Sequence, residues 1–260
     1  MKHYTRLKVL LFIIFISAVT APFVFADAKS DYDYQYGKYR QNYSEFQILK
    51  QDYLATPSLD NQQKALLSAK QSILARDLAK ASLHLYISDR INSYKNNYEL
   101  VKPILVALAE SRQYFLAEAK KSQAIVTQED IKKFTQSYLS IVPKHDSVLK
   151  FGLVANKISA LVRIQTDSKT ALDTLIPKLP TPLPTSLSAR ILELQDSAKV
   201  IDRKIDLLAN NLNLAEAVEE TTTDIFYTAK IEKLIEIRDL QLAWIERLID
   251  IDKNYVQPKI

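Results

Sequence analysis

Apolar residues recur at alternating steps of four and three positions in one long stretch of the chain. They are Leu187, Ile191, Leu194, Ala198, Ile201, Ile205, Leu208, Leu212 and Ala215. This spacing is the a/d pattern of a helix that packs on other helices along one narrow seam. Such a helix is not stable alone, because ordering its backbone costs about 1–2 kcal/mol per residue. The sequence therefore predicts a chain of helices that pack on one another.

Glycine and cysteine usage narrows the fold class further. Only Gly37 and Gly152 occur among 260 residues, and cysteine is absent. Phosphate loops, nucleophile elbows and tight β-hairpins depend on glycine, and thiolate metal sites and disulfides need cysteine. We therefore expect an all-α fold, in which an elongated antiparallel helical bundle is followed by a C-terminal coiled-coil hairpin.

Residues 1–26 have the three parts of a signal peptide, namely a basic start, an uncharged apolar run and a small-residue exit. We expect cleavage after Ala26, and the sequence also allows cleavage after Ala28. The alternative is an uncleaved anchor, because the apolar run reaches the lower limit of the roughly 17–25 residues that span a bilayer. The sequence thus predicts an exported protein, secreted or associated with the cell envelope, that meets the membrane only through an uncleaved leader.

The charge of the chain argues against a nucleic-acid partner. The formal net charge is +5, but the leader contains Lys2, Arg6 and Lys8 and no acid, which leaves 32 basic and 30 acidic residues from position 27 onward. Residues 27–184 carry 22 basic and 16 acidic side chains, whereas residues 185–260 carry 10 and 14. Opposite net charges favour docking between these two parts.

Breaker and capping residues divide the mature chain into elements. Thr56-Pro57-Ser58 ends one helix and caps the next, and Pro143 kinks or splits a later one. Residues 177–185 form a proline-rich linker, and residues 186–260 form the coiled-coil hairpin. We place the reversal of the hairpin at 219–224, with one continuous rod as the alternative. The helices expected in the bundle at 27–176 span about 29–56, 59–95, 102–124, 128–142 and 145–176.

Two groups of residues are candidate partner contacts. The first expected helix carries an aromatic seam, which could bind sugars or peptides but which we interpret as core; Tyr34 lies off this seam and is the exposed candidate. Pro180, Pro182 and Pro184 favour an extended polyproline conformation. They could dock on an aromatic groove of a partner, although we favour a spacer role. The aromatic seam of the first expected helix consists of Tyr32, Tyr36, Tyr39, Tyr43, Phe46 and Tyr53.

Motifs that carry chemistry are missing. His84 has no Glu three residues before it and no second His four residues away, as diiron and zinc helices require. His145 has only Asp146 beside it, which we interpret as a first-turn acid of a helix. We therefore expect no catalytic residue, no cofactor and no metal site.

The leading hypothesis is a secreted or envelope-associated scaffold or interaction protein that binds a protein partner or itself. The alternative is an envelope enzyme, such as a cell-wall hydrolase, whose carboxylates meet only in the fold.

The first two expected helices also carry a resemblance. The run from Tyr32 to Phe46, followed by Lys50-Gln-Asp-Tyr-Leu, Ala75-Arg-Asp and Tyr86, resembles uncharacterised exported, tyrosine-rich helical proteins of small-genome bacteria. It covers about residues 29–95, and more loosely 127–175. The resemblance implies export and helical architecture, and it implies no activity or site residue.

Overall fold

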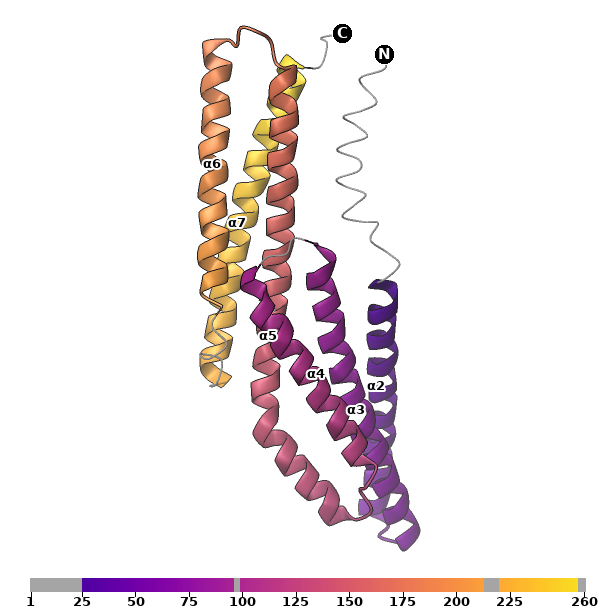
Figure 1. Ribbon diagram of the computed structural model, residues 1–260. Coiled ribbons are helices and arrows are strands. Elements are labelled where there is room, and N and C mark those ends of the chain that lie inside the picture. The colour runs from indigo at the N-terminus through magenta and orange to yellow at the C-terminus, as the bar shows by residue number, and fades with distance from the viewer. Residues whose placement is uncertain (1–24, 96–98, 213–219, 257–260) are drawn as a thin grey trace, which may run out of the picture.

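The computed structural model describes residues 25–95, 99–212 and 220–256. Over these residues the chain forms six α-helices, packed antiparallel, and no strand, which confirms the predicted fold class (Figure 1). Residues 1–24 of the expected leader at 1–26 lie outside the described residues, and Ala26 falls in the first turn of α2. The helices are α2 (Phe25–Ala55), α3 (Leu59–Ser93), α4 (Lys102–Ser122), α5 (Gln128–Leu175), α6 (Thr185–Asn210) and α7 (Glu220–Tyr255), with 3-10 turns η1 (Glu99–Val101) and η2 (Ile176–Lys178).

The helix starts that the sequence predicts are present. The Ser58 side chain accepts a hydrogen bond from the Asn61 backbone N–H at 3.1 Å and caps α3. Thr127 and Asp130 form a reciprocal capping box at the start of α5. These caps satisfy backbone donors that have no partner inside the helix.

Pro143 does not split α5. The two helices expected at 128–142 and 145–176 are one continuous helix, with proline in its interior. Proline removes one backbone donor and displaces the preceding turn, and Figure 1 shows α5 changing direction within its first half. Asp146 is therefore not a first-turn acid. It lies inside α5, where its Oδ1 atom is 2.5 Å from Lys80 Nζ of α3.

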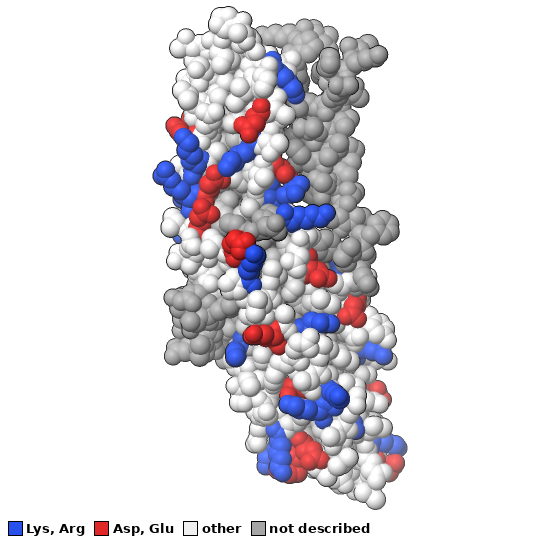
Figure 2. Space-filling model, in the orientation of Figure 1, with Lys and Arg blue, Asp and Glu red and all other residues white. Residues whose placement is uncertain are grey.

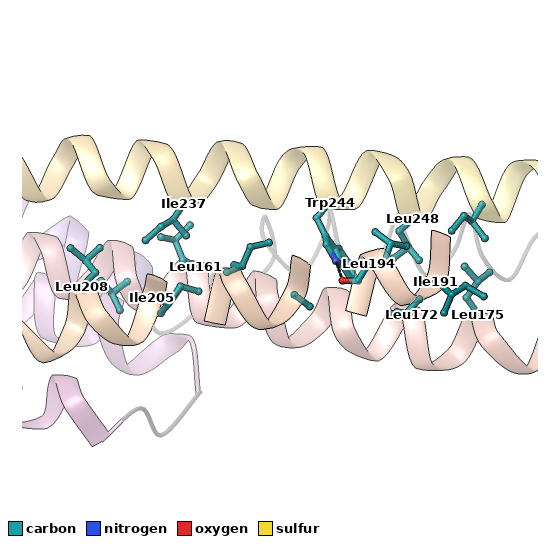
Figure 3. Packing of buried hydrophobic residues seen from close by; sticks show 14 of the residues in the cluster. Leu161, Leu172, Leu175, Ile191, Leu194, Ile205, Leu208, Ile237, Trp244 and Leu248 are labelled. Carbon is teal, nitrogen blue, oxygen red and sulfur yellow. Dashed lines mark hydrogen bonds between the residues drawn. The ribbon is translucent and has the colours of Figure 1, made fainter. Parts of the chain in front are cut away.

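The predicted ladder is the buried seam of α6. Every ladder residue from Leu187 to Leu208 is buried, Leu212 is partly buried, and Ala215 lies outside the described residues. The seam packs against α7 and also against the C-terminal half of α5, which contributes Val154, Ile158, Leu161, Leu172 and Leu175 to the same core (Figure 3). Residues 177–185 therefore turn the chain within one three-helix bundle, and they do not separate two cores.

Helices α6 and α7 form the expected antiparallel hairpin. Arg190 pairs with Asp250 near one end, and Lys204 pairs with Glu236 toward the other. Trp244 Nε1 donates to the Leu194 carbonyl at 2.7 Å between these pairs (Figure 3). The continuous rod is excluded. The reversal lies between Asn210 and Glu220, earlier than predicted, and residues 213–219 are outside the described part.

The other half of the molecule is organised around α3. Phe115 and Leu108 of α4 and Phe151 of α5 are fully enclosed against α3. Helix α2 packs on α3 from another side, but among its described side chains only Ala28 is buried. One flank of α2 is thus left uncovered. None of the helices in the described ranges combines the length and the apolar character that a bilayer span requires.

Candidate functional site

An open groove lies between α2 and the first turns of α5, with α3 as its floor. Its volume is about 220 Å³. This is below the range of roughly 300–1,000 Å³ that is typical of small-molecule sites, so the groove fits one or two apolar side chains of a docked chain. The lining residues are Tyr39, Tyr43 and Phe46 of α2, Ala69, Ser72, Ile73 and Arg76 of α3, and Ile131 and Thr135 of α5.

Three residues of the aromatic seam, Tyr39, Tyr43 and Phe46, form one wall of this groove, and the seam is not a closed core. Tyr36 is 44% exposed and Tyr43 is 46% exposed, and the other seam residues are only partly buried. The interpretation as core is therefore wrong for these two tyrosines. The reason is that the seam is wider than the single neighbour α3 can cover. Tyr39 and Tyr43 contact each other, with ring centroids 5.9 Å apart.

Arg76 supplies a polar group inside the groove. Its Nε atom donates to Asp77 Oδ1 at 2.8 Å, and its guanidinium carbon lies 3.4 Å from the centroid of the Tyr138 ring. Its Nη2 atom is buried and has no hydrogen-bond partner among the described residues. A buried donor without an acceptor costs about 1–3 kcal/mol.

Burial shifts the pKa values of the groups around Arg76. Asp77 is completely buried, and burial raises the pKa of its carboxyl, which Arg76 partly offsets. Burial also raises the pKa of the Tyr39 and Tyr138 hydroxyls. Both tyrosines are therefore neutral at pH 7, and their hydroxyls can donate hydrogen bonds.

The fold also brings together His84 and His145, neither of which belongs to a metal-binding or catalytic motif in the sequence. His84 Nδ1 donates to the Lys80 carbonyl at 2.7 Å, and His145 Nδ1 is hydrogen-bonded to Ser111 Oγ at 2.9 Å. Both rings lie around Phe115. Burial lowers the pKa of both imidazoles, that of His145 to about 4. Within the described ranges, no group of three or more acidic or histidine side chains is arranged to hold a metal ion.

The predicted contact residues are exposed but do not meet. Tyr34 is 58% exposed, and it precedes Tyr43 by nine positions, which places it on the opposite side of α2 from the groove. Pro180, Pro182 and Pro184 are exposed in the connection between α5 and α6. Leu179 and Pro184 have polyproline backbone angles, and the Thr181–Pro182 peptide bond is cis.

Sequence reasoning missed the groove itself, including Arg76, Ile131 and Thr135. One signal for the groove was available in the sequence. The α2 seam consists mainly of tyrosine, whose hydroxyl needs water or a hydrogen-bond partner, whereas a fully buried seam is typically built from leucine and isoleucine. The contribution of α5 had no local signal, since it depends on the path of the chain after α4. No known protein family, no curated protein and no solved structure matches this chain.

Proposed function

We propose that the protein is a secreted or envelope-associated helical scaffold or interaction protein, and that the groove is its docking site for a protein segment. The observation that carries this proposal is the aromatic wall of α2, in which Tyr43 is 46% exposed, opposite Ile131 and Thr135 of α5. Tyrosine and arginine are enriched in protein interfaces, because each combines a large contact surface with a hydrogen-bonding group.

The charges on the displayed face favour a protein partner over a polyanion there. Figure 2 shows basic and acidic side chains interspersed over the displayed face, with no extended region of one sign. A nucleic-acid site would need a stripe of Lys and Arg along one face. The mixed surface instead suits the rim of a protein interface, where charges of both signs contribute to specificity.

The enzyme alternative is less well supported by the geometry. Two carboxylates do come together in the fold, because Glu118 contributes to the raised pKa of Asp77. However, Asp77 is completely buried and paired with Arg76, and Glu118 is buried and paired with Lys121. A hydrolytic acid or base must reach the bond that it cleaves, and neither of these two side chains lines the groove.

Site-specific photo-crosslinking in the producing cell tests the docking function. A benzophenone amino acid replaces Tyr43 in the groove wall, and the control position is Leu192, which is 58% exposed on α6. We expect a discrete adduct from position 43 that is absent from position 192. Binding of the purified adduct partner should then be lost in Phe46→Ala. Identical adducts from both positions, or none from position 43, would refute docking in the groove.

The proposed export is tested separately by fractionation and N-terminal sequencing. We expect the protein outside the cytoplasm with Asp27 as its first residue. A cytoplasmic protein that retains Met1 or Lys2 would contradict export and would leave the groove proposal standing.

A further inference from the structure

The first part of α5, residues 128–142, is held on the rest of the molecule by a small contact. Within this arm only the side chain of Tyr138 is buried, whereas buried side chains recur at every turn of α5 from His145 onward. Tyr138 shares a small core with Ala81 of α3 and Phe115 of α4. Segments with few buried contacts open at low free energy while the rest of a fold stays intact. The arm is therefore the part of α5 that detaches most easily.

Pro143 marks the root of the arm. Proline has no N–H to donate to the carbonyl four residues earlier, here that of Leu139. Figure 1 shows α5 changing direction within its first half, and a proline inside a helix is a common cause of such a kink. A further bend at this point costs less than a bend elsewhere in α5, because one helical hydrogen bond is already missing.

Two buried histidines lie beside the root of the arm. His145 of α5 is hydrogen-bonded through Nδ1 to Ser111 Oγ of α4 at 2.9 Å. His84 of α3 is completely buried, and its Nε2 atom has no hydrogen-bond partner among the described residues. Both imidazole rings contact Phe115, the residue on which Tyr138 packs. The histidines and the arm thus share one small core.

The charged groups that face these imidazoles do not compensate a further positive charge. Lys80 of α3 and Lys144 of α5 are cations, and Asp146 of α5, the acid that acts on both rings, already pairs with Lys80 at 2.5 Å. The α4 side chains in contact with His145 are uncharged, namely Ser111, Tyr114 and Phe115. A protonated imidazole needs water instead, and the least anchored cover of this core is the arm.

We infer that His84 and His145 form an acid-sensitive latch, in which protonation of the histidines releases the arm 128–142 from Phe115 and withdraws the α5 wall of the groove. Ile131 and Thr135, which form that wall, both lie on the arm. Release of the arm follows from its packing, whereas its consequence for docking rests on the proposed function of the groove. Mild acid therefore opens the groove on one side and weakens docking.

Hydrogen–deuterium exchange of the purified protein tests the latch. After correction for the intrinsic pH dependence of amide exchange, opening of the arm should increase about tenfold between pH 7.5 and pH 5.5, because the released His145 regains its usual affinity for a proton. Amides of residues 194–205 in α6 should stay protected far longer at both pH values. The fluorescence of Trp244, the only tryptophan, should remain native.

Two variants separate the latch from the packing of the arm. His145→Asn removes a titrating group and keeps a hydrogen-bonding atom near Ser111 Oγ, so most of the tenfold response should disappear. Tyr138→Leu weakens the contact with Phe115 and leaves both histidines in place. This control should raise exchange of the arm at both pH values and retain the response. The wild-type profile needs no altered protein, so the latch stays testable even where a variant does not fold.

Exchange of the arm that is equal at the two pH values, or no faster than that of α6, would overturn the latch. So would a His145→Asn variant that shows the full wild-type response. The docking consequence has its own readout, because the crosslinking yield of the purified adduct partner at position 43 should fall between pH 7.5 and pH 5.5. An unchanged yield on an opened arm would refute the coupling to docking. If position 43 captures no protein, the proposed function fails, and the exchange experiment still decides on the latch.

Discussion

Gln241 Nε2 of α7 donates to Gln165 Oε1 of α5 at 3.2 Å, among the apolar side chains that α5, α6 and α7 bury together. The same nitrogen donates to the Leu161 carbonyl at 2.8 Å, and Gln165 Nε2 lies 3.3 Å from the Ala198 carbonyl of α6. The pair thus links all three helices. A shift of any helix by one turn would leave buried amides unpaired, so the pair selects one register.

Gln241→Leu should destabilise the protein by about 1–3 kcal/mol, because Gln165 Oε1 then loses its donor in a buried site. Replacing both glutamines by leucine should recover most of that loss, since both polar groups are removed together. Urea unfolding of the two single variants and the double variant measures the coupling. A double variant whose loss equals the sum of the single losses would show that the two amides act independently.

Replacing each of the two glycines by alanine should change the stability of the protein in opposite directions. A Cβ atom at Gly37 would meet no atom of the described residues within 4 Å, so Gly37→Ala should stabilise α2 by up to about 1 kcal/mol through helix propensity. A Cβ at Gly152 would lie 3.0 Å from Leu108 Cδ2 and 3.1 Å from Ile87 Cγ2. Overpacking costs about 1–3 kcal/mol, so Gly152→Ala should be destabilising overall. Thermal unfolding of both variants tests the contrast, and equal shifts would contradict it.

The elements that the sequence predicted correctly are those whose signals are local. The ladder from Leu187 to Leu208 combines spacing with aliphatic side chains, and the Thr127 capping box lies within four residues. The predicted split of the helix at Pro143 is wrong, because the packing of α5 along both halves of the molecule outweighs the local cost of proline.

The groove could not be predicted to the same extent. The periodicity at Tyr36 and Tyr43 shows that the residues share a side of a helix, but it does not show how many neighbours cover that side. Likewise, His84 and His145 are 61 positions apart, and only the packing of α5 alongside α3 brings them together around Phe115. Long-range packing of this kind has no signature in a single sequence.

Arg76→Met should destabilise the protein by about 3–5 kcal/mol at pH 7.5, because the buried Asp77 carboxylate loses its cation. The pKa of Asp77 is already raised by burial and should rise further. A carboxyl whose folded pKa exceeds its unfolded value loses stability as the pH rises, so the deficit should shrink at pH 5. Urea unfolding at both pH values measures this change. Asp77→Asn in the same background should remove the pH dependence, and a deficit independent of pH would contradict this account.

His145 should make the protein less stable in mild acid. Its pKa is lowered from 6.5 to about 4, chiefly by burial and also by the neighbouring His84. Below pH 6.5 the unfolded chain therefore binds a proton that the folded chain does not, and stability falls as the pH falls toward 4. Between pH 7.5 and pH 5.5 this one group should remove roughly 1–1.5 kcal/mol, from 1.36 kcal/mol per pKa unit.

His145→Asn isolates that contribution, because asparagine does not titrate and keeps a hydrogen-bonding atom near the position of Nδ1, which bonds Ser111 Oγ. The comparison is between the pH 7.5 to 5.5 loss of stability in the wild type and the same loss in the variant, measured by urea unfolding. We expect the variant to lose roughly 1–1.5 kcal/mol less. Subtraction cancels the titration of Asp77 and of the surface carboxylates, which both proteins share. If the two proteins lost equal stability over this range, the folded imidazole would be binding its proton as readily as the unfolded one, and its burial beside Phe115 and Tyr114 would not control its charge.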